Sequence, residues 1–145
     1  MRRLSAVALL LAAALVTPAS AVAAASLVSV SPQRLNFGTK AVGTTTFKTV
    51  TVTNTSGTNL LVAISGGLPD DFGWGPVNID QDLCVFSGGE LLAPGDSCQV
   101  FVRFSPTEFF VQFGRQTGTL QVTASDPSTL EVLETAVVTV SGTGR

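Results

Sequence analysis

Hydrophobic and polar residues alternate one by one along much of the chain. Val50 and Val52 are separated by threonines at positions 49, 51 and 53, so the two kinds of side chain fall on opposite faces of an extended segment. Period-two alternation of β-branched residues predicts a strand with one buried face. The same pattern recurs in residues 97–104, 117–125 and 133–142, and its predicted inward residues are Cys98, Val100, Val102, Phe104, Leu120, Val122, Ala136, Val138 and Val140.

Shorter segments complete the pattern. Residues 27–31 and 34–38 predict two short strands separated at Pro32, and Leu60 to Ile64 predicts another after a turn at Ser56-Gly57. Beyond the first 25 residues, the chain has no sustained apolar spacing of three and four residues, which a surface helix would require. About seven to nine short strands with frequent turns predict an all-β fold, an antiparallel β-sandwich.

The first 25 residues have a different pattern. Arg2 and Arg3 precede an apolar run from Leu4 to Val16, and small residues continue to Ala25. This order is typical of a secretory signal peptide, with cleavage expected near residues 21–25. The run of about 13 residues is shorter than the roughly 20 that span a bilayer, although an uncleaved anchor is the alternative. We therefore expect residues 26–145 to form one exported domain with no stable membrane span.

The charge pattern excludes one class of function. Without Arg2 and Arg3, six basic residues face ten acids, and the basic residues are scattered singly. Nucleic-acid binding needs concentrated positive charge to neutralise phosphates. We therefore expect no nucleic-acid partner.

Two cysteines, Cys84 and Cys98, are present in the chain. An even count in an exported protein predicts a disulfide bond, with two free thiols or a metal pair as the alternatives. The residues between them are rich in glycine and show little alternation, so this segment is expected to be irregular and tied by the bond to a core strand. Pro94-Gly95 just before Cys98 predicts a type II turn.

The chain offers little catalytic chemistry. It contains no histidine and no tyrosine, which removes the histidine-dependent triads and the commonest general base. Carboxylate pairs remain at Asp70-Asp71 and at Asp80 with Asp82, but glycosidases that use two carboxylates need a walled cleft. We expect a protein that is not an enzyme and needs no cofactor.

Binding of calcium or carbohydrate is the alternative function. Asn78, Asp80 and Asp82 alternate like the first ligands of a calcium loop, but Leu83 occupies the position where an EF-hand requires glycine. Trp74, between two glycines, could stack on a sugar.

Aromatic residues are the candidates for contact with a partner. Trp74 is one of them, and Phe109, Phe110 and Phe113 form a cluster that cannot all face inward on one strand. Each aromatic either covers an end of the sandwich or forms an interface with another molecule.

Several short motifs, taken in order, resemble the ASH (Hydin-like) family of immunoglobulin-like domains, which occurs in bacteria in "choice-of-anchor D" proteins. The resemblance covers about Ser29 to Gly144 and rests on residues 35–38, 42–43, 52–55, 94–98, 104–106 and 142–144. It implies an immunoglobulin-like sandwich related to major sperm protein (MSP) and PapD-like domains, without catalytic residues. One departure is the long aromatic segment after Pro106.

Together these observations predict an exported, non-enzymatic immunoglobulin-like module. It would have a structural or protein-interaction role in the periplasm, at the cell surface or outside the cell. Its partner would be a protein or a component of the cell envelope.

Overall fold

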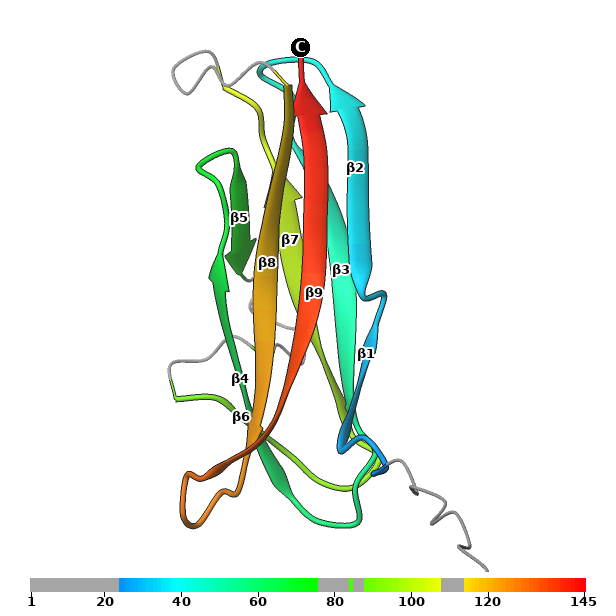
Figure 1. Cartoon of the computed structure of the whole chain (residues 1–145), viewed down its shortest axis with the longest axis vertical. Coiled ribbons are helices and arrows are strands. Elements are labelled where there is room, and N and C mark those ends of the chain that lie inside the picture. The colour runs from blue at the N-terminus through cyan, green and yellow to red at the C-terminus, as the bar shows by residue number, and fades with distance from the viewer. Residues whose placement is uncertain (1–23, 76–83, 85–87, 108–113) are drawn as a thin grey trace, which may run out of the picture.

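The computed structural model describes residues 24–75, 84, 88–107 and 114–145. Strands are the regular secondary structure of this part of the chain, as the alternation predicts (Figure 1). Nine are present among the described residues: β1 (Val28–Ser31), β2 (Arg34–Lys40), β3 (Thr46–Asn54), β4 (Leu60–Gly67), β5 (Phe72–Gly75), β6 (Glu90–Leu92), β7 (Ser97–Phe104), β8 (Gly114–Ser125) and β9 (Val132–Gly144).

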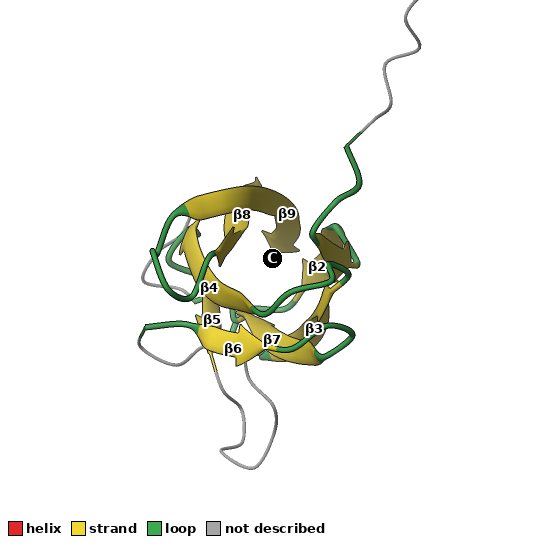
Figure 2. Ribbon diagram, turned by 90° about the horizontal axis from the view of Figure 1, so that it is seen from below, coloured by secondary structure: helices red, strands yellow, loops and turns green. Residues whose placement is uncertain are grey.

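The strands form two sheets that pack face to face (Figures 1 and 2). Sheet A has the order β1-β3-β7-β5, and sheet B has the order β2-β9-β8-β4-β6. The pairing of β2 with β9 is parallel, and the other pairs in the described residues are antiparallel. The predicted antiparallel sandwich is therefore confirmed, with one parallel edge strand.

The inward residues are those that the alternation predicts. In β7 the residues Cys98, Val100, Val102 and Phe104 are all buried. Val50 and Val52 of β3 lie opposite Val100 and Cys98, and they are buried too. At one end of this core, the ring of Phe104 stacks on that of Phe72 with centroids 4.5 Å apart, and Phe37 packs against both rings. Such aromatic pairs stabilise the folded protein by more than the burial of their apolar surface alone would.

The break at Pro32 divides one extended run of chain between the two sheets. β1 pairs with β3 in sheet A, and β2 pairs with β9 in sheet B. The outer edge of β2 is occupied by groups of the chain itself, because the Lys48 ammonium donates to the Asn36 carbonyl oxygen at 2.7 Å. The Asn36 side chain in turn accepts a hydrogen bond from the Gly38 N–H, where the register of β2 shifts.

The lower end of the sandwich in Figure 1, where β3 finishes, is organised by Asn54. Its amide group donates to the carbonyl oxygens of Thr58 and Leu92 at 2.8 and 2.9 Å. Its backbone bonds to Gly95 and Asp96 in the turn that follows Pro94. Gly95 has a φ of 86°, and the Asp96 N–H donates to the Ala93 carbonyl oxygen, which confirms the predicted type II turn.

The upper end, where the C-terminus lies in Figure 1, joins three of the sequence motifs. Gly43 donates its N–H to the Pro106 carbonyl oxygen at 2.9 Å. A Cβ placed on Gly142 would lie 2.7 Å from the ring of Phe104, and one on Gly144 would lie 2.9 Å from Pro106. The spacing of these motifs along the chain thus reflects direct contact between them in space.

The short strand β6 differs from the expectation that the segment between the cysteines is irregular. Residues Glu90–Leu92 pair with β4, and Leu92 lies opposite Leu60 in the core. Three residues are too few to show an alternating pattern, so their pairing is decided by the neighbouring strand. In the part of the chain that the structure describes, no helix has the length and hydropathy needed to cross a membrane.

Candidate interaction surfaces

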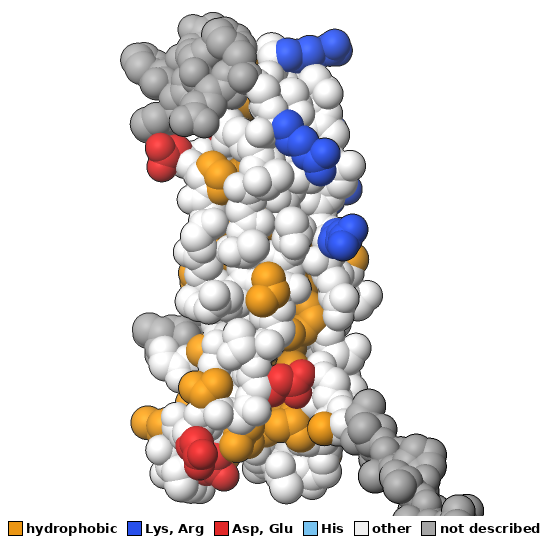
Figure 3. All heavy atoms as spheres, viewed as in Figure 1, with side chains coloured by type: hydrophobic (Ala, Val, Ile, Leu, Met, Phe, Trp, Pro, Cys, Tyr) orange, Lys and Arg blue, Asp and Glu red, His pale blue; other side chains and the backbone are white. Residues whose placement is uncertain are grey.

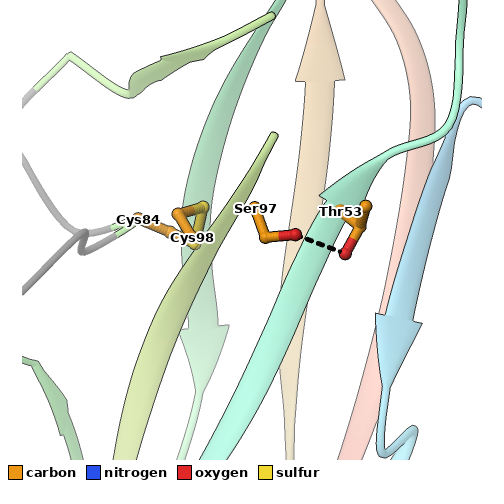
Figure 4. The surroundings of a disulfide bond; sticks show 4 residues. All are labelled: Thr53, Cys84, Ser97 and Cys98. Atoms are coloured by element: carbon orange, nitrogen blue, oxygen red, sulfur yellow. Dashed lines mark hydrogen bonds between the residues drawn. A yellow bond between two sulfur atoms is a disulfide. The ribbon is translucent and has the colours of Figure 1, made fainter. Parts of the chain in front are cut away.

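The disulfide between Cys84 and Cys98 is formed, as predicted (Figure 4). The two Cα atoms lie 5.2 Å apart, and both residues are buried. The Cys84 N–H also donates to the Gln99 carbonyl oxygen at 3.1 Å, so Cys84 lies alongside β7. The bond therefore fixes one residue of the segment between β5 and β6 against the core, and neither sulfur is available as a thiolate.

A shallow groove of about 390 Å³ lies beside the disulfide, between β6 and the start of β7. Its walls are residues 90–92 and 95–98, which include the carboxylates of Glu90 and Asp96. Small-molecule sites are enclosed mainly by hydrophobic and aromatic side chains. This groove does not have such walls.

The carboxylates of Asp70 and Asp71 lie in different environments. Asp71 is buried, and its Oδ2 accepts a hydrogen bond from Gln116 Nε2 at 2.6 Å. Its Oδ1 accepts from the backbone and the hydroxyl group of Thr107 at 3.2 and 3.3 Å. Asp70 is exposed to solvent. Asp71 thus ties the end of β7 to β8, which is a structural role.

Trp74, a predicted contact residue, is 38% exposed and lies on the edge strand β5, opposite Val102. The other predicted contact residues, Phe109, Phe110 and Phe113, lie outside the described residues, as do Asn78, Asp80 and Asp82 of the possible calcium loop. Within the described ranges, no group of three or more acidic or cysteine residues is placed to hold a metal ion.

The hairpin between β8 and β9 carries an apolar surface that the sequence reasoning missed. Leu130, Val132 and Leu133, which we call the hairpin cluster, are all exposed, Leu130 by 66%. In Figure 3 most of the hydrophobic side chains on this face gather in its lower half. A signal was present in the sequence: β9 has apolar residues at successive positions, so its alternation cannot bury all of them.

Leu130 has a backbone conformation that leucine rarely adopts. Its φ is 60°, in the left-handed region where glycine and asparagine are common. The hairpin turn holds it there, because the Leu130 N–H donates to the Asp126 carbonyl oxygen at 2.8 Å. The Asp126 carboxylate accepts hydrogen bonds from the Thr129 and Ser128 N–H groups, and these hold the pKa of Asp126 below its usual value.

A second exposed surface lies on the outer face of sheet A, near the upper end. Phe47 of β3 is 49% exposed. It lies directly opposite Arg103 on the neighbouring strand β7, and Arg103 lies opposite Gly73 on β5. The Arg103 guanidinium lies across Gly73, since a Cβ there would be 3.2 Å from it. We call Phe47 and Arg103 the Phe–Arg strip, which combines an exposed ring with a positive charge.

Charges are segregated along the long axis. The strand register places the six basic residues of the described part in the upper half, and the view in Figure 3 agrees. Of the seven acidic residues in that part, five lie in the lower half: Glu90, Asp96, Asp126, Glu131 and Glu134. The hairpin cluster therefore has acidic surroundings, and the Phe–Arg strip lies in the basic half.

Comparison with known proteins identifies the fold. No family model matches the chain, and no curated protein matches it in sequence. Among solved structures, the ASH/PapD-like domain 7 of human CEP192 superposes with a TM-score of 0.57 and 17% identity, over 92% of this chain and 94% of that one. WR4, an MSP family member of C. elegans, gives 0.54 and 10% identity over 83% of this chain and 100% of its own.

A third similar structure is the E. coli chaperone DraB, with a TM-score of 0.53 and 12% identity over 79% of this chain and 53% of DraB. The chain therefore has the immunoglobulin-like fold that ASH, MSP and PapD-like domains share, as the resemblance implied. The narrower relation to choice-of-anchor D proteins stays a prediction.

Proposed function

We propose that this chain is an exported, non-enzymatic immunoglobulin-like module with a structural or protein-interaction role in the cell envelope or outside the cell. The observation that carries the proposal is the buried disulfide between Cys84 and Cys98. Disulfides persist in oxidising compartments and are rare in the cytosol. The charged and apolar start of the chain supports the same location, with residues 1–25 as a signal peptide and 26–145 as the exported domain.

An interaction role is supported by the surface of the molecule. Exposed apolar side chains are grouped at the hairpin cluster, while the groove beside the disulfide lacks the walls of a small-molecule site. Trp74 is exposed on an edge strand. Together with Phe109, Phe110 and Phe113, it is proposed to contact the partner.

The location is tested by expressing the full chain with a C-terminal tag in a bacterium. We expect the protein outside the cytosol, with a mass that corresponds to loss of about the first 25 residues and with both cysteines resistant to alkylation until reductant is added. A matched chain without residues 2–25 should stay in the cytosol. Recovery of the intact chain in the cytosol with two reactive thiols would contradict the proposal.

The partner contacts are tested in the exported protein by photo-crosslinking. A crosslinking amino acid at position 74 should give an adduct that the same group at Thr119, an exposed residue on the outer face of sheet B, does not give. Equal labelling from both positions would show that Trp74 is not part of a contact.

A further inference from the structure

We propose that copies of this chain associate head to tail, with the hairpin cluster of one copy on the Phe–Arg strip of the next. This inference names a partner for the interaction role and so rests on the proposed function. The first observation is Leu130, which is 66% exposed and has a left-handed backbone conformation. Glycine would adopt this conformation without strain, so the leucine side chain is displayed at the cost of local stability.

The second observation is the separation of charge. Asp126 and Glu131 flank the hairpin cluster, and the other acidic residues of that half, Glu90, Asp96 and Glu134, extend the negative charge. Binding at the hairpin cluster is favoured for a partner whose apolar contact residues are surrounded by basic side chains. Among the described residues the upper half of the same chain has this character, because Arg103 lies beside the exposed ring of Phe47.

The arrangement predicts the type of assembly. A contact between two different surfaces is heterologous, and it continues into an open chain of copies unless the rotation closes a ring. In this contact the leucine and valine side chains would pack on Phe47, and Glu131 would face Arg103. The contact combines an apolar centre with a charged rim, so salt should weaken it by screening.

The test is sedimentation velocity of the purified protein from micromolar to millimolar concentration, at low and at high salt. We expect the average mass to rise continuously with concentration beyond that of a dimer, and less steeply at high salt. A monomer at every concentration would overturn the inference but not the proposed export. A species that stops at a dimer would overturn the open head-to-tail assembly.

Leu130→Gly separates association from folding. We expect this replacement to lower the association constant on the order of tenfold, because it removes an apolar side chain that becomes buried when two copies associate. The melting temperature should be unchanged or higher, because glycine relieves the strained backbone. Leu130→Asn should have the same effects on association and melting temperature, because asparagine also adopts the left-handed conformation readily. The matched control is Val137→Thr, which removes an exposed apolar side chain from the middle of sheet B and should leave association unchanged.

Charge reversal identifies the acceptor surface. Glu131→Lys and Arg103→Glu should each weaken association on the order of fivefold, and the double variant should regain most of the loss. Arg34→Glu is the control, because Arg34 also lies in the basic half but on β2 of sheet B. If Glu131→Lys is compensated by Arg34→Glu and not by Arg103→Glu, the Phe–Arg strip is not the acceptor.

Discussion

Asn54 is the residue at which three separate segments of the chain meet. Its side chain bonds to the turn after β3 and to Leu92 of β6, while its backbone bonds to the turn after Pro94. The residue is fully buried, and no buried side-chain polar atom in the described part of the chain lacks a partner. The resemblance motifs at 52–55 and 94–98 therefore describe one hydrogen-bonded unit at the lower end.

Replacement of Asn54 by alanine is expected to lower the free energy of unfolding by about 3 kcal/mol, because it removes the buried hydrogen bond to the Leu92 carbonyl oxygen and opens a cavity. Denaturant unfolding measures the loss. The control is Asn36→Ala, which removes one exposed hydrogen bond to Gly38 and should cost less than about 1 kcal/mol. Similar losses in both variants would show that Asn54 does not organise this end.

At the scale of elements, β9 approaches the end of β7 more closely than any side chain at position 142 would allow. A Cβ on Gly142 would lie 2.7 to 3.0 Å from three atoms of the Phe104 ring, and that ring is fully buried in contact with Phe72 and Phe37. The ring cannot move away without disturbing this aromatic group. Gly142 is therefore required by packing.

Gly142→Ala is expected to destabilise the protein by about 2 kcal/mol through overpacking. In combination with Phe104→Leu, which removes the ring, the loss should be smaller than the sum of the two single losses. Thermal or denaturant unfolding of the four proteins of this cycle tests the coupling. Gly57→Ala is the control, since a Cβ there has open space around it. Strict additivity would mean that the two residues do not constrain each other.

The longer strands could be predicted from the sequence because alternating apolar and polar residues indicate a strand with one buried face. The inward residues of β3, β7, β8 and β9 are the predicted ones. β5 and β6 were not predicted. Two of the four residues of β5 are glycines, which are uncommon in strands, and the three residues of β6 are too few to show a period. The pairing of these strands depends on β7 and β4.

The candidate surfaces were less accessible to sequence reasoning. The disulfide followed from the cysteine count and the export signal. The successive apolar residues at the start of β9 were the signal for the hairpin cluster, but a strand buried between two layers has the same pattern, so the signal did not show that these residues are exposed. The left-handed conformation of Leu130 is set by the turn around Asp126, and the sequence gives no local sign such as glycine at that position.

At the scale of the whole molecule, the disulfide restricts the unfolded chain as well as the folded one. Its 14-residue separation closes a loop that would otherwise be free in the unfolded state. In the folded state it joins the segment before β6 to the beginning of β7, near the lower end of sheet A and next to the Thr53–Ser97 hydrogen bond of 2.7 Å. The bond therefore links an inner strand of sheet A to the part of the chain that precedes β6 of sheet B.

The double replacement Cys84→Ala and Cys98→Ala is expected to lower the free energy of unfolding by about 3 kcal/mol. The unreplaced protein in the presence of reductant should lose a similar amount, and reductant should leave the double variant unchanged. Urea unfolding followed by tryptophan fluorescence provides the measurement. A loss below about 1 kcal/mol would mean that the loop is held by other contacts.

The way in which Lys48 and Asn36 occupy the outer edge of β2 has a consequence for the behaviour of the protein in concentrated solution. A strand from a misfolded neighbour would have to displace an ammonium group and a side-chain amide before it could pair there. Pairing of a foreign strand with this edge of β2 is therefore disfavoured, which makes fibril growth from that side less favourable.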